Sequence, residues 1–334
     1  MTDKLTSLFN TVGIAKPTNT LKFKDQHTYE QLIQQSAYKD NKKVYFQYAH
    51  DPDILENKYY ALNKNIFTAL NNKSRLPEWT GYKYLPRRDI VAIDDFQKAI
   101  SKWKFPFVLK PGDDLPTAGG YGVMICYDND DLIKAKQKIV KARHMTDTII
   151  IEQKIESVTN YSVQYAYSKN EGVRYLGTTE QLTNEYGDYK GNQSAQNVPD
   201  AVIQAGREIM EIGAKNGYFG IAGFDLLVDK NNDIYAIDLN FRQNGSTSML
   251  LLDSFLHDGY HKFYNYISSH DNEQFFDVIL KYVKKNVLFP LAYYDGYWFA
   301  NEAVKSRFCG IWHGGDRGYI EKMEQEFLKE LNKN

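Results

Sequence analysis

The spacing of hydrophobic residues along this chain predicts a mixture of strands and helices. Short apolar runs typical of buried strands are interspersed with segments whose apolar residues recur every three or four positions, as on one helix face. Strands are expected at residues 44–50, 105–111, 123–128, 148–155, 161–168 and 172–182, and helices at 63–72, 93–100, 130–143, 200–216 and 319–331. Residues 111–122 and 184–199 read as polar loops, and Arg75-Leu76-Pro77 is expected to stop the helix that begins near Asn63. The predicted fold class is mixed α/β and α+β.

The same pattern suggests three parts. Residues 1–58 are expected to form a small N-terminal α/β lobe. Residues 59–150 contain a strand, a glycine loop, a second strand and an amphipathic helix, and residues 151–334 contain the remaining strands and a charged C-terminal helix. A chain of 334 residues with 43% hydrophobic content can bury a sizeable core over two or three such lobes.

Charge and composition narrow the classes of partner. The formal net charge is -1, from 41 basic and 42 acidic side chains, so no global attraction to nucleic acid or an anionic membrane is expected. The chain shows neither a signal peptide nor a run of about 18 apolar residues, which predicts a cytoplasmic location. Cys126 and Cys309 lie far apart without metal-like spacing, so neither a disulfide scaffold nor a zinc site is expected.

A predicted two-stranded ribbon around Asn231-Asn232 carries the acidic residues of most interest. If these two residues form the turn, Asp225 lies directly opposite Asp238, and Asn240 lies on the same face two residues further on. The other face is then wholly apolar and consists of Phe224, Leu226, Val228, Tyr235, Ile237 and Leu239. Because two opposed carboxylates repel each other, keeping both ionised requires a cation or other compensation, and a hard divalent ion would supply it. Mg²⁺ prefers such oxygen ligands and completes its shell with water and phosphate oxygens.

The alternative is an exposed ribbon whose acids are simply solvated, which is the usual fate of alternating acids in a strand. Arg242 favours the functional interpretation, because it continues the alternation of Asp238 and Asn240 and can neutralise phosphate charge. Asn244-Gly245-Ser246 adds a loop with free backbone amides beside it. The ribbon is therefore interpreted as a metal site for a phosphate-bearing ligand.

A lysine and a glycine-rich loop supply a second set of candidate phosphate contacts. Lys110 ends an apolar strand, and Gly119, Gly120 and Gly122 follow in the next loop. A lysine at a strand end provides a point charge, while glycine amides can approach phosphates closely. The loop matches neither the Walker loop nor the dinucleotide fingerprint, and a glycine cluster between strands is more often a hairpin connection.

In motif and order, residues 60 to 255 resemble the ATP-grasp superfamily of carboxylate–amine ligases. The resemblance rests on five successive elements: the lysine-bearing segment Asn63-Lys64, the strand FPFVLKP with Lys110, the glycine loop at 119–122, the strand IIIEQKI with Glu152, and an acid followed by acid-x-Asn-x-Arg, here Asp225 and then Asp238, Asn240 and Arg242. Five elements in the right order are far more specific than any one of them. The family usually has glutamate where Asp225 and Asp238 stand, which shortens the ligand arms without changing their chemistry.

The resemblance implies an ATP-grasp fold, in which two lobes sandwich ATP, and a role for each matched residue. ATP would be bound by Lys64, Lys110, Gly119, Gly120, Gly122, Glu152, Gln153, Ile155 and Asn160. Mg²⁺, or Mn²⁺, would be bound by Asp225, Asp238 and Asn240, with Arg242 as a catalytic group. A looser match of the loop with Tyr186 to the family's substrate-covering loop suggests Lys190 as a second catalytic group, and the ribose site falls near Asn160 or Glu156.

The resemblance also implies the reaction. ATP phosphorylates a carboxylate, an amine attacks the acylphosphate, and ADP and phosphate are released, so the chain mainly positions groups and neutralises charge. The string NFRQNGST is most similar to amino-acid and peptide ligases, so small-molecule carboxylate and amine substrates are expected, without nucleic acid or membrane, and a homodimer is compatible. Two alternatives stay open, namely a catalytically silent nucleotide-binding regulator and a small-metabolite kinase.

Overall fold

The computed structural model describes residues 2–15, 17–18, 20–21, 23, 25–45, 47, 54–112, 122–142, 146–184, 187–269, 271–299 and 304–332. The chain forms two compact units. The central unit comprises Lys43–Lys190 and Ala195–Asn244, and the terminal unit comprises Met1–Lys42, Gly191–Ser194 and Gly245–Asn334. The expected boundaries at residues 58 and 150 stay a prediction. Within the described ranges, no helix is long and apolar enough to cross a membrane.

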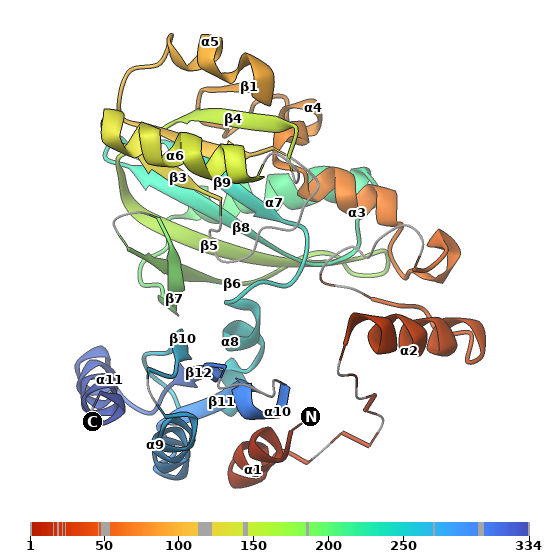
Figure 1. Ribbon diagram of the computed structural model, residues 1–334, viewed down its shortest axis with the longest axis vertical. Coiled ribbons are helices and arrows are strands. Elements are labelled where there is room, and N and C mark those ends of the chain that lie inside the picture. Colours follow the sequence, from red (N-terminus) through yellow and green to blue (C-terminus); the bar gives the residue numbers. More distant parts are fainter. Residues whose placement is uncertain are drawn as a thin grey trace. The chain divides into compact units, whose positions relative to one another are not determined.

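The central unit contains a four-stranded antiparallel sheet in the order β1-β4-β2-β3 (Figure 1). Its strands are β1 (Arg88–Ala92), β2 (Phe107–Pro111), β3 (Met124–Cys126) and β4 (Thr148–Gln153). On one face, Phe107, Leu109 and Ile151 form an apolar core with residues of α5 (Phe96–Ile100) and α6 (Asn129–Ala142). Because strand side chains alternate, Lys110 and Glu152 project from the opposite face.

A second antiparallel sheet of the same unit has the strand order β6-β5-β8-β9. Its strands are β5 (Ser157–Ser168), β6 (Gly172–Thr183), β8 (Gly220–Asp229) and β9 (Ile234–Asn240). Helix α7 (Asp200–Lys215) packs against β5, β6 and β8 and buries Ile209 and Met210. Gly213 permits a close approach, because a Cβ there would lie 2.2 Å from the Phe241 ring.

The remaining elements of this unit correct three local predictions. Helix α3 (Lys64–Asn71) already ends at Asn71, the 3₁₀ turn η2 (Lys73–Arg75) follows, and Pro77 lies in the first turn of α4 (Leu76–Thr80), where a proline costs no hydrogen bond. The predicted helix at 93–100 is a 3₁₀ turn, η3 (Ile93–Asp95), followed by α5. The stretch 184–199 contains a strand, β7 (Tyr189–Ser194). Of the expected strand at 44–50, Val44 makes one parallel bridge with Tyr60, and residues 46 and 48–50 lie outside the described residues.

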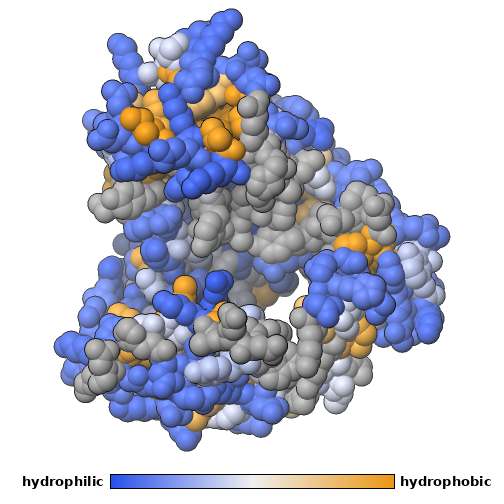
Figure 2. All heavy atoms as spheres, in the orientation of Figure 1, coloured by the Kyte–Doolittle hydropathy of each residue, from blue (hydrophilic) through white to orange (hydrophobic). Residues whose placement is uncertain are grey.

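The view in Figure 2 shows mainly hydrophilic side chains, in agreement with a mean hydropathy of -0.55. Hydrophobic side chains gather on the surface over α6, where Ile133 and Val140 are exposed. Single exposed apolar residues are ordinary on proteins. The two cysteines are free, with Cys126 buried in the core of the first sheet.

The terminal unit is built on the antiparallel strands β10 (Lys262–Ile267), β11 (Leu288–Tyr294) and β12 (Arg307–Trp312), with β10 also pairing residues 191–193 of β7. The unit's helices are α1 (Asp3–Thr11), α2 (Gln26–Tyr38), α8 (Thr247–Leu251), α9 (Asn272–Lys284), α10 (Gly296–Phe299) and α11 (Arg317–Leu331). Aromatic residues dominate its core, where Tyr282, Trp312 and Phe327 are packed edge to face. The abundance of aromatic residues therefore serves packing here.

His313 lies in this unit with only 3% of its surface exposed, and its ring stacks on His257 at 5.2 Å. Burial, followed by the charges of His257 and His261, lowers the pKa of His313 from 6.5 to about 4. Between these pH values the unfolded chain binds a proton that the folded chain excludes, so acidification destabilises the fold. We expect the free energy of unfolding to fall by roughly 2 to 3 kcal/mol between pH 6.5 and 4 through this group.

Urea unfolding of wild type and of His313→Phe across this pH range measures the effect. The variant is expected to show a flatter pH dependence, whereas His27→Phe, at an exposed position of α2, should keep the wild-type slope. Parallel slopes for His313→Phe and wild type would contradict the assignment.

Candidate active site

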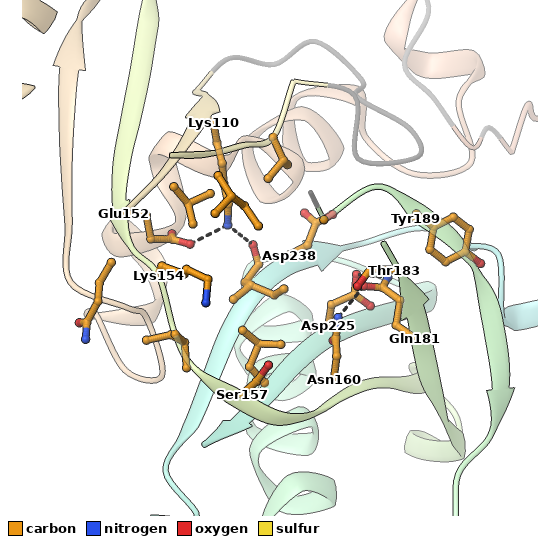
Figure 3. A pocket seen from close by; sticks show the side chains of 18 of the residues that line it. Lys110, Glu152, Lys154, Ser157, Asn160, Gln181, Thr183, Tyr189, Asp225 and Asp238 are labelled. Atoms are coloured by element: carbon orange, nitrogen blue, oxygen red, sulfur yellow. Dashed lines mark hydrogen bonds and ion pairs between the residues drawn. The ribbon is translucent and has the colours of Figure 1, made fainter. Parts of the chain in front are cut away.

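A cavity of about 260 Å³ lies in the central unit, between the two sheets (Figure 3). Its described lining brings together many residues that the sequence singled out, namely Lys110, Glu152, Gln153, Ile155, Asn160, Asp225 and Asp238. Figure 3 shows Lys110 and Glu152 projecting from the first sheet, while Asn160, Asp225 and Asp238 lie on strands of the second. A site for a bound molecule between two sheets follows from this arrangement.

The hairpin β8–β9 places Asp225 directly opposite Asp238, which confirms the predicted pairing. The route to it differs from the prediction. The turn spans three residues, 230–232, since Asp229 N–H donates to the Asp233 carbonyl at 3.1 Å, and only Asn232 has a positive φ, of 65°. The pairs next to the turn are therefore shifted by one residue from those predicted.

A β-bulge at Ile237 compensates for this shift. Leu226 pairs with Ala236 and Asp225 with Asp238, so Ile237 is an extra residue on β9. Bulges of this kind often re-aim side chains beside active sites. The prediction that Ile237 lies on the apolar face is wrong, because Ile237 lines the cavity and the buried Ala236 packs opposite Leu226 instead.

Asp225 is buried, with 5% of its surface exposed. Its Oδ2 accepts a hydrogen bond from Gln181 Nε2 at 3.0 Å, and Gln181 Oε1 in turn accepts one from Asn160 Nδ2 at 2.7 Å. Asp225 Oδ1 and Asn160 Oδ1 have no hydrogen-bond partner among the described residues. Burial, followed by the charge of Asp238, raises the pKa of Asp225 to about 7. A buried acceptor without a donor is costly, which makes Asp225 Oδ1 a candidate ligand for a cation.

Asp238 lies beside a lysine that the sequence did not single out. Lys73 Nζ is 3.0 Å from Asp238 Oδ1, and Lys73 lines the cavity. Burial acts to raise the pKa of Asp238, but the charge and hydrogen bond of Lys73, together with the charges of Arg242 and Lys110, outweigh it and lower the pKa below its ordinary value. Lys64, the lysine predicted for this part of the site, begins α3 and is absent from the described lining of the cavity.

Glu152 forms ion pairs with two basic side chains in the wall of the cavity. Its Oε1 accepts a hydrogen bond from Lys110 Nζ at 2.6 Å, and its Oε2 lies 2.6 Å from Arg88 Nη2. Lys110 Nζ also donates to the carbonyl of Ile237 at 3.0 Å, so the bulge provides one of its acceptors. With both oxygens engaged, the Glu152 side chain serves to orient Lys110.

The other predicted residues are placed as follows. Asn240 pairs with Gly223 at the end of the ladder and is buried. The charge of Arg242, two residues further on, helps to lower the pKa of Asp238 and partly offsets the raised pKa of Asp225. Lys190 lies in β7 next to the cavity-lining Tyr189. Gly122 has a φ of 93°, and Gly119, Gly120 and Tyr186 lie outside the described residues.

Comparisons with known proteins agree with this geometry. Residues 86–240 match the family model described as "L-aspartate--L-methionine ligase, ATP grasp". Residues 1–68 and 254–332 match the N-terminal and C-terminal domain models of the same ligase. The chain belongs to this ATP-grasp ligase family. It is therefore an enzyme that joins a carboxylate to an amine, and the function expected from the resemblance is confirmed at this level.

Solved structures show the same fold as this ligase. Carboxyaminoimidazole ribonucleotide synthase from Aspergillus clavatus, complexed with ATP, is similar with a TM-score of 0.67 at 14% identity, covering 98% of this chain and 94% of that chain. N5-carboxyaminoimidazole synthetase from Staphylococcus aureus, complexed with ADP, gives 0.65 at 12%, covering 94% and 85%. An L-amino acid ligase from Bacillus licheniformis gives 0.58 at 14%, covering 96% and 89%. The predicted ATP-grasp fold is confirmed.

Proposed function

We propose that this ligase forms a peptide bond between L-aspartate and L-methionine, with ATP activating the carboxylate. The reaction type follows from the family, and the two amino acids follow from the family's description. The observation that supports the site is the pair of opposed carboxylates, Asp225 and Asp238, in a cavity that also holds Lys73 and Lys110. Two lysines beside two acids suit a nucleoside triphosphate bound with a divalent cation.

The residues present fit Mg²⁺ or Mn²⁺. Asp225 has one buried oxygen without a hydrogen-bond partner in the part of the chain that the structure describes, and Asp238 and Asn240 offer further hard oxygen donors. Mg²⁺ usually takes one or two carboxylates and completes its shell with water and phosphate oxygens. Bound there, the cation would neutralise charge on the transferred phosphate.

The chain's own groups act mainly by position and charge. Lys110 and Lys73 are proposed to hold phosphates, with Glu152 fixing the direction of Lys110. Gln153 and Ile155 line the cavity, and their backbone is proposed to bind the base. Asn160 Oδ1, which has no hydrogen-bond partner among the described residues, is proposed to accept a ribose hydroxyl. Arg242 is proposed to stabilise the charge on the acylphosphate oxygens, and Lys190 remains a candidate contact to the amino acid substrates.

The deciding experiment measures ADP release with single amino acids and pairs, followed by mass analysis. L-Aspartate with L-methionine is expected to give ADP, phosphate and a product whose mass is the sum of both amino acids less one water. Chelation of divalent metal should stop turnover, and Mg²⁺ or Mn²⁺ should restore it. A phosphorylated product that forms equally with and without added amine would identify a kinase. Nucleotide binding without ADP release across the panel would identify a regulator. Either result would overturn the proposal.

A further inference from the structure

The segment that carries Asn240 and Arg242 continues past the end of the sheet. The ladder between β8 and β9 ends with the pair Gly223 and Asn240, so Phe241 lies one residue beyond it. Residues beyond a strand lose the ladder that fixes their direction. Asn240 and Arg242 nevertheless flank the metal and phosphate positions proposed above, and both need a fixed orientation.

Phe241 is the fixed point between them. Its ring is fully buried and packs at 5.4 Å on Trp79, 5.0 Å on Tyr218 and 5.2 Å on Phe224. Gly213 completes the pocket around this ring, because a Cβ at position 213 would lie only 2.2 Å from a ring carbon of Phe241. Phe241 and Arg242 form a bend beyond the end of β9, and the buried Phe241 ring anchors the chain at this bend, between Asn240 and Arg242.

The backbone of Phe241 is held by a side chain from another element. Asn71, the last residue of α3, accepts a hydrogen bond from Phe241 N–H at 3.0 Å through Oδ1. Its Nδ2 donates to the Phe67 carbonyl at 2.9 Å and approaches the Phe241 carbonyl at 3.5 Å. The amide thus supplies to Phe241 the donor and acceptor that a neighbouring strand would provide.

The same end of α3 reaches the site a second time. Lys73, two residues after Asn71, makes the 3.0 Å ion pair with Asp238. One short stretch of chain therefore contacts β9 through a side chain at Asp238 and the segment beyond it through the backbone of Phe241. These contacts lie on either side of Asn240.

We propose that Asn71 is a positioning residue of the ligase, which orients Asn240 and Arg242 toward the metal and the transferred phosphate by holding the backbone of Phe241. The inference rests on the proposed function for the roles of those two residues. Asn71 itself lies outside the described lining of the cavity, so its effect on the reaction passes through Phe241.

The test compares Asn71→Ala with Asn65→Ala, which removes an exposed asparagine from the same helix. Asn71→Ala is expected to lower kcat about 10- to 100-fold, because small displacements of reacting groups have effects of this size. Its KM for ATP should change less than about threefold, and Asn65→Ala should change kcat less than about twofold. Equal kcat values for both variants would overturn the inference.

A double-mutant cycle separates positioning from general stability. In an Arg242→Ala background, Asn71→Ala is expected to cost less than about threefold further in kcat, since the two changes disable one unit. The same loss in both backgrounds would show that Asn71 acts only through the fold. Asn71→Asp keeps the acceptor for Phe241 N–H and should remain more active than Asn71→Ala. Equal losses in these two variants would also contradict the inference.

A binding readout keeps the inference testable if the proposed amino acids give no turnover. Mg²⁺ is expected to tighten the binding of a non-hydrolysable ATP analogue to wild type and Asn65→Ala. In Asn71→Ala the enhancement should be several-fold smaller, while binding without metal stays unchanged. If wild type shows no ligation but this difference holds, only the proposed substrates fail. An unchanged enhancement in Asn71→Ala would overturn the role of Asn71.

Discussion

Replacing Asp225 with asparagine is expected to lower ATP-dependent ligation at least about 100-fold, through the loss of a charge that no other group can supply at this position. Asparagine keeps the shape of the side chain, and its Oδ1 can still accept the hydrogen bond from Gln181. The substitution removes the negative charge that would neutralise the cation. Of the opposed acids Asp225 and Asp238, Asp225 carries the buried oxygen that lacks a hydrogen-bond partner among the described residues, so its charge is the one expected to matter most. ADP release under saturating ATP and amino acids measures the loss.

The same substitution is expected to leave stability equal or higher at pH 8 without metal. The pKa of Asp225 is raised to about 7, so ionising this carboxyl in the folded chain is unfavourable, and stability is lost as the pH rises through that value. Asparagine removes this cost. The control is Asp233→Asn, an exposed acid of the same hairpin, which should retain wild-type turnover. Asp225→Asn with normal turnover would remove the metal assignment, and a large fall in melting temperature would mean that lost folding explains the lost activity.

Lys73→Met is expected to reduce kcat/KM for ATP by about 100-fold, whereas Lys64→Met should change it less than about twofold. Lys73 is 16% exposed, lines the cavity and pairs with Asp238, so its removal takes a cation from both the acid and the proposed phosphate. Methionine retains most of the apolar stem, which limits the effect on packing. Steady-state kinetics at varied ATP concentrations compare the two variants directly.

These two lysines are a matched pair, since they lie nine positions apart at opposite ends of the same helical region. A large loss in Lys64→Met with normal kinetics in Lys73→Met would restore the assignment made from the sequence and contradict the geometry. Similar losses in both would point to two phosphate contacts.

Much of the fold could be predicted from local patterns. The apolar runs at 105–111 and 148–155 became β2 and β4 because alternate residues fill the core under α5 and α6. Residues 184–199 were harder, because β7 is polar and short, and a strand of that kind has no hydrophobic period to reveal it. Pro77 was misleading, because a proline can either end one helix or lie in the first turn of the next, and here it lies in the first turn of α4.

In the site, too, local contacts could be predicted and long-range contacts could not. Asp225 and Asp238 could be paired by counting, because a hairpin is local and its register follows from the turn. Lys73, Gln181 and Arg88 were missed, since the acid that each contacts lies at least 40 positions away in the sequence. Lys73 had one available signal, a lysine directly after the Asn71-Asn72 pair at which the helix ends, but nothing local indicated an acid nearby.

The bulged residue Ile237 is not needed for the pairing of the two strands of the hairpin. Without it, Ala236 would be followed by Asp238, and the pairing of Asp225 with Asp238 would continue a regular ladder from Leu226 and Ala236. The opposed acids therefore do not require the bulge, whereas the carbonyl that receives Lys110 does. A redesigned chain with one residue fewer here would keep the two opposed acids and lose the Ile237 carbonyl that accepts from Lys110, so a single deletion would separate the tuning of the proposed nucleotide site from that of the proposed metal site.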